Sequence, residues 1–466
     1  MHRVALGLGF VAVAVAVATA PCAVSAATPT NVDVSQRVGN ESEEAIAVNP
    51  TNPNNIVVFT NVGHAEAGLT AGMFLGVSFD GGATWTRRLV ALGGNDPLGD
   101  ACCDPSLSFD QYGNLFMTYL FQTENTVPVA LSTDGGLTFS VVANIVAPPK
   151  GTPTKAAGDG RGLFRFVDQP TITTGHGEVW LVFNAGGPMF ATGARVTGLG
   201  EVGPFGVGQV IPGTNNCTYG DISVGPQGQV MQACALTESG QGGGKIFVNV
   251  DPDGLGPAGF GDRVLATETH VGGFDFIPPQ SDRSIDSEPG LAWGSAHGGR
   301  VYLVYAAETK NESDDTDVFV RHSDDGGATW SSGVRVNDDA TTTSQFLPKI
   351  SLDPTTGNLA VVWHDSRADL GLGGPGDTDG VSDDDAQLWG AFSTDGGLAF
   401  TPNVQISAGT SNAHDSGNGI DYGDFIGLSF FGGVAHPAWS DNSNSTGTNP
   451  DGSLSKFDIY TAAVRP

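Results

Sequence analysis

The chain has 466 residues, with 50 acidic and 20 basic side chains and a formal net charge of −30 at pH 7. Nucleic acids and anionic membrane surfaces are bound through clustered cations, so this balance argues against both as partners. Hydrophobic residues make up 39% of the chain, enough for a sizeable core, and no linker-like change of composition divides it.

The N-terminus has the pattern of a secretory signal peptide. His2 and Arg3 precede an apolar run from Val4 to Ala20, and small residues follow at 24–26. We expect cleavage after Ala26, which leaves residues 27–466 as a single secreted or extracytoplasmic domain without stable membrane insertion. A retained membrane anchor is the alternative. We also expect a monomer.

The rest of the chain repeats one unit of four short strands. Each unit starts with an acidic residue or proline and an apolar alternation, then has a turn and a strongly apolar strand; the seven starts lie near 44–48, 104–107, 168–172, 221–224, 288–291, 348–351 and 424–428. A repeat of about 60 residues with four strands is the organisation of a propeller blade. The sequence therefore predicts an all-β propeller of four-stranded antiparallel blades. Seven blades are favoured, and six remain the alternative.

Four of these units share a turn motif of the form S-x-D-x-G-x-T followed by an aromatic residue. The copies lie at 78–85, 132–139, 323–330 and 393–400, and in the last copy Ala399 replaces the threonine. The aspartate can accept hydrogen bonds from the backbone ahead of it, and glycine supplies a positive φ. We assign a structural role to these aspartates, which are Asp80, Asp134, Asp325 and Asp395.

The two ends of the chain predict how the ring closes. The last strand, at 457–462, matches the third strand of a blade, and no fourth strand follows it. Residues 32–35 resemble a fourth strand and precede the first unit. We expect them to complete the C-terminal blade, which removes an exposed sheet edge.

Four cysteines remain after signal-peptide removal, an even number in an oxidising compartment. Cys217 and Cys234 flank a predicted hairpin and are candidates to pair. Cys102 and Cys103 are adjacent and are candidates for a vicinal disulfide. The alternative is that they pair elsewhere or stay as small buried residues.

The predicted topology separates two faces. The Asp-motif turns belong to one face, and the starts of the inner strands belong to the other, together with the loops between second and third strands. The second face carries a set of inner-strand carboxylates, which are Asp104, Asp168, Glu288 and Asp424. A ring of them is the best candidate for catalysis, although each could also serve only to accept backbone hydrogen bonds.

Calcium is the expected cofactor, because it takes six to eight oxygen ligands and one loop of this face is rich in them. Its candidate ligands are Asp377, Asp379, Asp383 and Asp385. The alternative is that this loop is merely solvated.

The turn motif resembles the Asp box of bacterial neuraminidase repeats. Together with the phrases at 363–367, 422–428 and 438–441, the repeats resemble the sialidase superfamily over nearly the whole mature chain. The resemblance implies an arginine triad that binds the substrate carboxylate, a tyrosine nucleophile paired with a glutamate, and an aspartate acid/base. The arginines near the predicted loop face are Arg161, Arg165, Arg283 and Arg367, of which Arg165 and Arg367 are the candidates for the site. Tyr305 with Glu308 or Tyr422 with Asp424 are the candidate nucleophile pairs.

The chain departs from that pattern, because the Arg-Ile-Pro phrase of the first triad arginine is absent and 165–168 is only a faint echo of it. Two main hypotheses follow. One is an exo-acting glycoside hydrolase of sialidase type, or another glycosidase that uses a carboxylate pair. The other is a non-catalytic, calcium-stabilised propeller that binds a glycan or protein through Trp363, Asp365, Tyr422, Trp439 and Asp441. A structural or adhesive module is a third.

Overall fold

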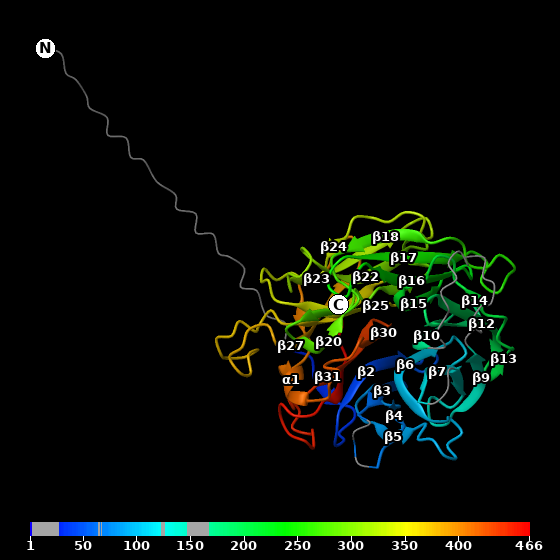
Figure 1. Ribbon diagram of the computed structural model, residues 1–466, viewed down its shortest axis with the longest axis horizontal. Coiled ribbons are helices and arrows are strands. Elements are labelled where there is room, and N and C mark those ends of the chain that lie inside the picture. Colours follow the sequence, from blue (N-terminus) through cyan, green and yellow to red (C-terminus); the bar gives the residue numbers. More distant parts are fainter. Residues whose placement is uncertain (2–27, 64–65, 67, 123–125, 147–166) are drawn as a thin grey trace.

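A computed structural model describes residues 1, 28–63, 66, 68–122, 126–146 and 167–466. These residues form seven antiparallel sheets arranged in a ring, and the chain passes through them in sequence order (Figure 1). Each sheet is built on four antiparallel strands whose first member lies innermost, and two of the sheets carry a fifth short strand. The protein is therefore a seven-bladed β-propeller, and the predictions of blade number and blade topology are confirmed.

The blades have the following strands. Blade 1 contains β2 (Glu41–Val48), β3 (Ile56–Val62), β4 (Met73–Ser78) and β5 (Thr86–Val90). Blade 2 contains β6 (Ala101–Phe109), β7 (Leu115–Phe121), β8 (Thr126–Ser132) and β9 (Ser140–Val146). Blade 3 contains β10 (Asp168–Gly175), β11 (Glu178–Asn184), β12 (Met189–Gly198), β13 (Glu201–Val202) and β14 (Gln209–Val210). Blade 4 contains β15 (Thr218–Val224), β16 (Val230–Thr237), β17 (Gly244–Asp251) and β18 (Val264–Thr269).

A separate hairpin of β19 (Asp275–Ile277) and β20 (Gln280–Ile285) precedes blade 5. Blade 5 contains β21 (Gly290–Trp293), β22 (Val301–Glu308), β23 (Thr316–Ser323) and β24 (Val334–Arg335), with a short 3-10 helix at Ala296–Gly298. Blade 6 contains β25 (Gln345–Leu352), β26 (Leu359–Asp365), β27 (Asp385–Ser393), β28 (Val404–Gln405) and β29 (Ser411–Asn412), followed by α1 (Ala413–Ser416). Blade 7 contains β30 (Gly427–Phe431), β31 (Val434–Asp441), β32 (Asp458–Ala462) and β1 (Asn31–Asp33).

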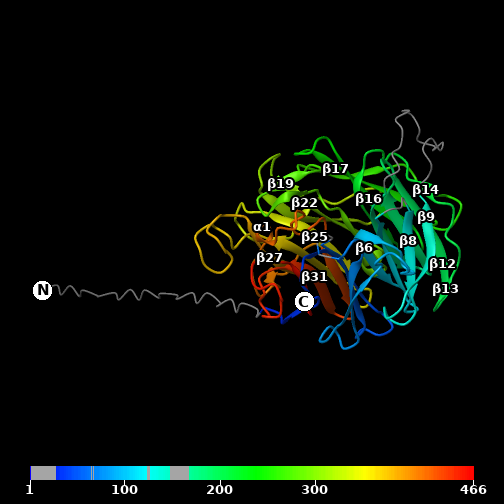
Figure 2. The same ribbon diagram turned by 60° about the horizontal axis from the view of Figure 1, so that its bottom comes forward.

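Blade 7 closes the ring with strands from both ends of the chain. β1 pairs antiparallel with β32, in the register Asn31↔Ala462 to Asp33↔Tyr460. The turned view shows the C-terminus beside β31 of this blade (Figure 2). The predicted closure is confirmed, and it removes an edge that could pair with another chain.

The hydrophobic core lies between neighbouring blades. One cluster joins Val57 and Leu75 of blade 1 to Met117 and Ala130 of blade 2, and similar clusters recur around the ring. Because each blade packs on its neighbours through large buried side chains, the ring holds the inner strands around its axis with little room to shift. The inner strands are therefore a rigid frame for any site at the channel.

The four Asp-motif turns, in blades 1, 2, 5 and 6, lie at the opposite end of their blades from the inner-strand starts. In blade 1, Ser78 pairs with Ile56, whereas Glu41 pairs with Val62 at the other end of the same strand. Thr84 Oγ1 donates to Asp80 Oδ2 over 2.6 Å, and its backbone N–H donates to Oδ1 over 2.8 Å. The turn is therefore held by its own side chains, as the motif predicts.

Among the described residues, no helix is both long and apolar enough to cross a membrane.

Candidate functional site

The start of each inner strand carries one residue with a positive φ. These seven residues have φ values between 36° and 82°, and they are Glu43, Asp104, Gln169, Tyr219, Glu288, Leu347 and Gly423. In β2, β6, β10, β15 and β25 the sheet register shifts at this residue, which marks a β-bulge. Six of the seven are not glycine, and each such backbone conformation costs about 1–3 kcal/mol. Strain repeated around one end of a channel points to a functional site there.

Proline follows the strained residue in four blades, at Pro105, Pro170, Pro289 and Pro348. A residue before proline is disfavoured in the right-handed helical region, and proline has no N–H to contribute to the sheet ladder. The acidic residue or proline at the start of each repeat therefore coincides with the bulge. From the sequence alone this pattern predicts where the inner strands begin, and the backbone angles are needed to show that a bulge lies there.

Carboxyl groups from five blades meet at these bulges around one arginine. We call this set the channel-mouth cluster; its members are Glu43, Asp104, Asp168, Asp286, Glu288, Asp424 and Arg283. The structure thus brings together all four carboxylates that the sequence nominated. Sequence reasoning did not nominate Glu43 or Asp286, although Glu43 precedes the first predicted strand start by a single residue.

Hydrogen bonds fix the cluster to the bulged backbone. Asp104 accepts from the N–H of Gln169 over 2.9 Å, and Glu43 accepts from the N–H of Asp424 over 3.3 Å. Asp104 also hydrogen-bonds to the side chain of Asp168, so these two carboxyl groups, from neighbouring blades, share a proton. Asp104 and Glu43 are therefore positioned by a neighbouring blade as well as by their own.

Burial raises the pKa values of these acids. Burial raises the pKa of Glu43 to about 8, with a further contribution from the charge of Asp424, and it raises the pKa of Asp286 to about 7. The pKa values of Asp104 and Glu288 also lie well above their ordinary range, first because of burial and then because of neighbouring carboxylates. At pH 7 the cluster therefore holds protons that exposed carboxylic acids would release.

Arg283 supplies the opposing charge. It lies in β20, and its Nη2 donates to Asp424 Oδ2, so an inserted hairpin rather than a blade provides this cation. Its charge lowers the pKa values of Glu43, Asp168, Asp286 and Glu288 relative to burial alone. One arginine faces six carboxyl groups, so the site as described is not the arginine-rich pocket that an anionic sugar requires.

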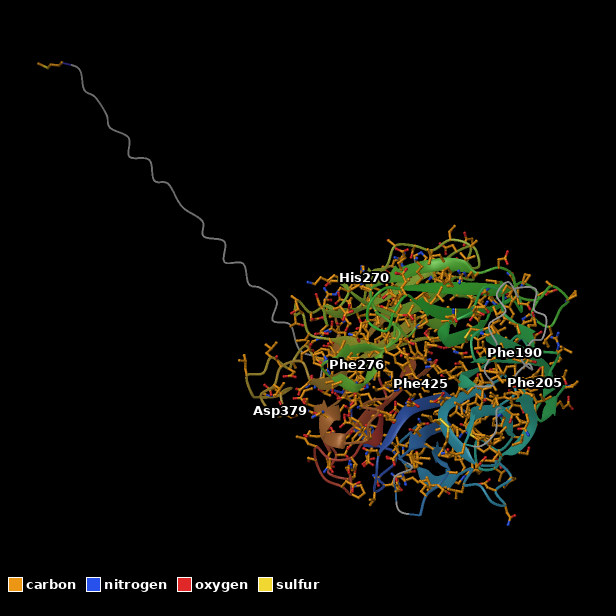
Figure 3. All side chains as sticks on the ribbon, viewed as in Figure 1. Phe190, Phe205, His270, Phe276, Asp379 and Phe425 are labelled. Atoms are coloured by element: carbon orange, nitrogen blue, oxygen red, sulfur yellow. A yellow bond between two sulfur atoms is a disulfide. The ribbon has the colours of Figure 1, made fainter. Side chains whose placement is uncertain are left out.

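A cavity of about 390 Å³ extends from the bulge residues Gln169 and Tyr219 along the axis of the ring, and all seven inner strands contribute to its walls. Glu44, Gln169 and Tyr219 lie at the end nearest the bulges, and Val224, Trp293 and Phe431 lie toward the Asp-motif face. Figure 3 labels Phe425, one of the lining residues, near the middle of the ring. A cavity with convergent polar groups at one end is the usual form of a ligand site.

Tyr219 is the blade-4 bulge residue, and its pKa is raised well above 10 by burial and then by Glu288. The two tyrosines nominated from the sequence lie elsewhere. Tyr305 stacks on Phe319 with ring centroids 5.7 Å apart, and Tyr422 donates to the carbonyl of Ser411. Charges of the cluster acids Glu288, Asp286 and Asp424 add to the effect of burial on the pKa of Tyr219, so its phenol stays protonated at neutral pH.

The two arginines nominated from the sequence are not among the residues of the cluster. Arg165 lies outside the described residues. Arg367 donates to Asp365 over 2.7 Å and to Asp338 over 2.8 Å, and its guanidinium lies 4.3 Å from the centre of the Trp389 ring. These contacts all belong to the region of blades 5 and 6, where Arg367 ties loops together.

The nominated ligand-binding aromatics are buried. Trp363, Tyr422 and Trp439 are each at most 1% exposed. The indole N–H groups donate to Asp365 and Asp441 over 2.6 and 3.1 Å, so these two acids are partners of the tryptophans. In this structure the five residues form part of the blade core.

Two groups of aspartates in the 369–385 loop could hold a metal ion. Oxygens of Asp369, Asp384 and Asp385 lie within 4.8 Å of one another, as do those of Asp377, Asp379 and Asp385. Asp383, also nominated, instead accepts from the N–H of Ser344 over 2.7 Å. Among the described residues, both such groups lie in this loop and neither includes a member of the channel-mouth cluster.

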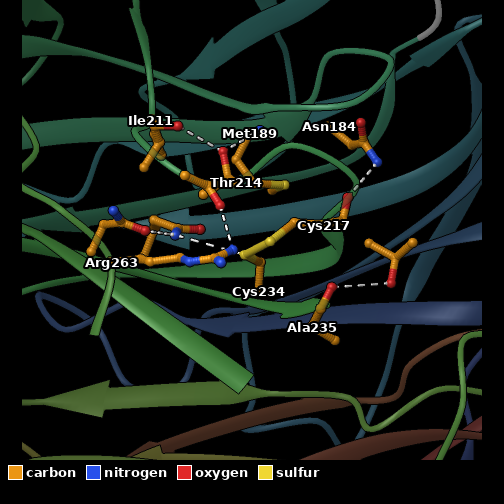
Figure 4. The surroundings of a disulfide bond; sticks show 12 residues. Asn184, Met189, Ile211, Thr214, Cys217, Cys234, Ala235 and Arg263 are labelled. Carbon is orange, nitrogen blue, oxygen red and sulfur yellow. Dashed lines mark hydrogen bonds between the residues drawn. A yellow bond between two sulfur atoms is a disulfide. The ribbon is translucent and has the colours of Figure 1, made fainter. Parts of the chain in front are cut away.

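The four cysteines form two pairs in the structure, Cys102–Cys103 and Cys217–Cys234. Figure 4 shows the second pair, which links the start of blade 4 to β16; the carbonyl of Cys217 accepts from Asn184 of blade 3 over 3.1 Å. The vicinal pair directly precedes Asp104 in β6. It therefore stiffens the segment that holds one of the cluster acids.

Comparison with known proteins extends these observations only to the fold. No family model matches the sequence, and no curated protein does. Among solved structures, polysaccharide lyase Uly1 is similar with a TM-score of 0.50 and 10% identity, covering 94% of this chain and 99% of that one. The phage phi92 endosialidase has a TM-score of 0.49 and 10% identity, covering 94% of this chain and 69% of that one. The arabinanase of Penicillium chrysogenum has a TM-score of 0.44 and 12% identity, with coverages of 94% and 99%. At 10% identity, the similarity to Uly1 concerns the fold alone.

Proposed function

We propose that this protein is a glycoside hydrolase that acts on an uncharged glycan at the channel-mouth cluster. The observation that carries the proposal is the coexistence, at one end of the channel, of protonated acids with an arginine-paired carboxylate. Glycoside hydrolysis needs this combination, because one carboxylic acid must protonate the leaving oxygen while a carboxylate on the other side acts as base or nucleophile. Burial and neighbouring charge separate the two roles.

In this proposal Asp104 is the general acid. Burial raises the pKa of Asp104. The carboxyl group of Asp168 is hydrogen-bonded to it and can return a proton to Asp104 after the reaction. Asp104 donates its proton to the glycosidic oxygen as the bond from that oxygen to the anomeric carbon breaks. The cluster thus supplies the proton without help from solvent.

Asp424 is the carboxylate partner. Arg283 donates to it, and Gln169 Nε2 lies 3.5 Å from the same oxygen. Asp424 either takes a proton from the attacking water or forms the bond to the anomeric carbon, and the separation of the two carboxyl groups in the substrate complex decides between these routes. Glu288 and Asp286 are buried acids with raised pKa values beside this pair.

The charge of the site favours an uncharged sugar. The one described arginine of the cluster is already paired with Asp424, Lys349 is the other cation that acts on Glu288, and the whole chain carries a net charge of −30, so a carboxylate-bearing sugar would find little compensating charge. This separates the proposal from a strict sialidase. It retains the carbohydrate-directed activity that the Asp-motif repeats suggest.

We also propose an extracytoplasmic location. Two cysteine pairs support it, because disulfides persist in oxidising compartments. The predicted signal peptide lies outside the described residues and is tested by N-terminal sequencing of the mature protein.

The proposal is tested with a panel of fluorogenic glycosides, both neutral sugars and a sialoside, together with neutral polysaccharides. We expect turnover of at least one neutral substrate. Glu288→Gln should lower it, whereas Glu308→Gln should not. Glu308 is a matched control, since it is also buried and burial raises its pKa to about 7, but its carboxylate accepts from Ser313 and Asp314. Turnover of the sialoside alone would contradict the assignment of substrate charge.

A non-catalytic, calcium-stabilised binding propeller is the second candidate. The aspartates of the 369–385 loop favour it, because Asp369 and Asp385 are buried and their oxygens converge with that of Asp384. Failure of every substrate, combined with a rise of melting temperature on calcium addition, would favour this candidate over the hydrolase.

A further inference from the structure

The β19–β20 hairpin is an insertion between blades 4 and 5 that reaches across to blade 7. Gln280 donates to the carbonyl of Gly423 and accepts from the N–H of Tyr422, over 2.9 and 2.8 Å. The N–H groups of Asp282 and Arg283 both donate to Asp421. The hairpin is therefore fastened beside the blade-7 bulge, at the channel mouth.

The underside of the hairpin covers blade 6. Ile277 and Ile285 are buried with Phe346 and Leu347 in one apolar cluster. Leu347 is the blade-6 bulge residue, and it is the one bulge position with a large apolar side chain. The hairpin therefore supplies the apolar packing for the one bulge residue that is not polar or glycine.

The upper side of the hairpin presents two exposed aromatic rings. Phe274 and Phe276 are 58% and 48% exposed, whereas Asp275 between them is 1% exposed. Figure 3 shows Phe276 on this hairpin. Exposing two phenylalanines so close together has no value for folding, and such apolar patches commonly mark binding sites.

The backbone beneath these rings is fixed on both sides. Phe274 N–H donates to the carbonyl of Gly240 over 2.8 Å, and Phe276 N–H donates to Gln241 Oε1 over 3.0 Å. The Asp275 carboxylate accepts from two further N–H groups, those of Gly242 and Gly272. The rings are therefore carried on an ordered support, which lowers the entropic cost of binding through them.

We propose that Phe274 and Phe276 form a stacking subsite that holds a sugar ring of an uncharged glycan chain beside the channel-mouth cluster. This inference rests on the proposed function, and it adds a substrate-binding element to it. The same hairpin carries Arg283 to Asp424, so the rings and the cation of the cluster belong to one inserted element. Aromatic rings offer large apolar area with two rotatable bonds, which suits the C–H faces of sugars.

The surrounding charges select the ligand. After burial, the nearby charges of Glu312 and Asp314 raise the pKa of Asp275. Asp282 and its partner Asp421 add two further acids beside the hairpin. A polyanionic chain would meet this acidic border before it reached the rings. The subsite therefore suits neutral polysaccharides.

The test is glycan affinity electrophoresis of the full chain with linear arabinan, xylan and polysialic acid as probes. We expect wild type to bind a neutral probe, and the double variant Phe274→Ala, Phe276→Ala to bind it at least tenfold more weakly. Phe79→Ala is the matched control, because Phe79 is 46% exposed but lies in an Asp-motif turn on the opposite face. Phe276→Trp should retain binding.

The outcomes separate this inference from the proposed hydrolase. Binding that the double variant loses, without hydrolysis by wild type, supports the subsite and contradicts the hydrolase. Hydrolysis with undiminished binding by the double variant overturns the subsite and leaves the hydrolase standing. Binding of polysialic acid but of neither neutral probe overturns the assignment to an uncharged glycan.

Discussion

Replacement of Asp286 by asparagine should make the protein more stable at neutral pH and leave it unchanged in acid. Asp286 lies between the hairpin and blade 5, is 9% exposed, and uses Oδ1 to accept the N–H of Glu288 over 2.7 Å. Asparagine keeps that acceptor and has nearly the same shape. The variant therefore removes a titrating group without removing its hydrogen bond.

The magnitude follows from the pKa. Burial raises the pKa of Asp286 from 3.8 to about 7, so the folded protein holds a proton that the unfolded chain releases above pH 3.8. The contribution of this group to stability is full below the unfolded value and is lost as the pH rises to about 7. A shift of about three units corresponds to about 4 kcal/mol. Asp286→Asn should thus gain up to about 4 kcal/mol over wild type between pH 4 and pH 8.

Urea denaturation at pH 4 and pH 8 measures this difference. Asp262→Asn is the matched control, because Asp262 is exposed in the connection between β17 and β18, and its effect should stay within about 0.5 kcal/mol at both pH values. A stability difference for Asp286→Asn that does not grow with pH would refute the assignment of a buried, protonated acid at this position.

Three further predictions concern other parts of the structure. Arg283→Ala should raise the pKa of Glu43 above its value of about 8 and move the pH profile of hydrolysis to higher pH, with Arg283→Lys moving it less, as pH–rate measurements would show; an unmoved profile would place Arg283 outside the site. Ala399→Thr should add a hydroxyl donor to Asp395, which now accepts only N–H groups from this part of its turn, and raise stability by about 1 kcal/mol in thermal melts; a lowered melting temperature would contradict the hydrogen bonding of the motif. Asp385→Asn should abolish any calcium-induced rise in melting temperature, and a rise that persists would exclude the 369–385 aspartates as ligands.

The sequence predicts the ring because its signals are local. Turn motifs and alternating strands repeat within each blade, and blade closure follows from residues 32–35 matching a missing strand. The carboxylates Asp104 and Glu288 could be nominated for the same reason, because each stands at a fixed place in its repeat.

The rest of the site depends on contacts distant in sequence. Arg283 reaches Asp424 across 141 positions through a hairpin that belongs to no repeat, and no periodic signal marks it. Trp363 and Trp439 were nominated for stacking because they are aromatic, but their burial is decided by the packing of neighbouring blades. The proline after a bulge residue was visible, but its meaning required the backbone angles.

The most direct test of the account is the release of reducing ends from neutral glycans by wild type and by Asp104→Asn. The account predicts turnover of at least one neutral glycan by wild type and a loss of about 100-fold or more in the variant, since a positioned acid contributes about 10²–10⁴ in rate. Both proteins should fold and bind the glycan alike. Equal turnover by Asp104→Asn, or no turnover of any neutral glycan by wild type, would contradict a hydrolytic site at the channel mouth.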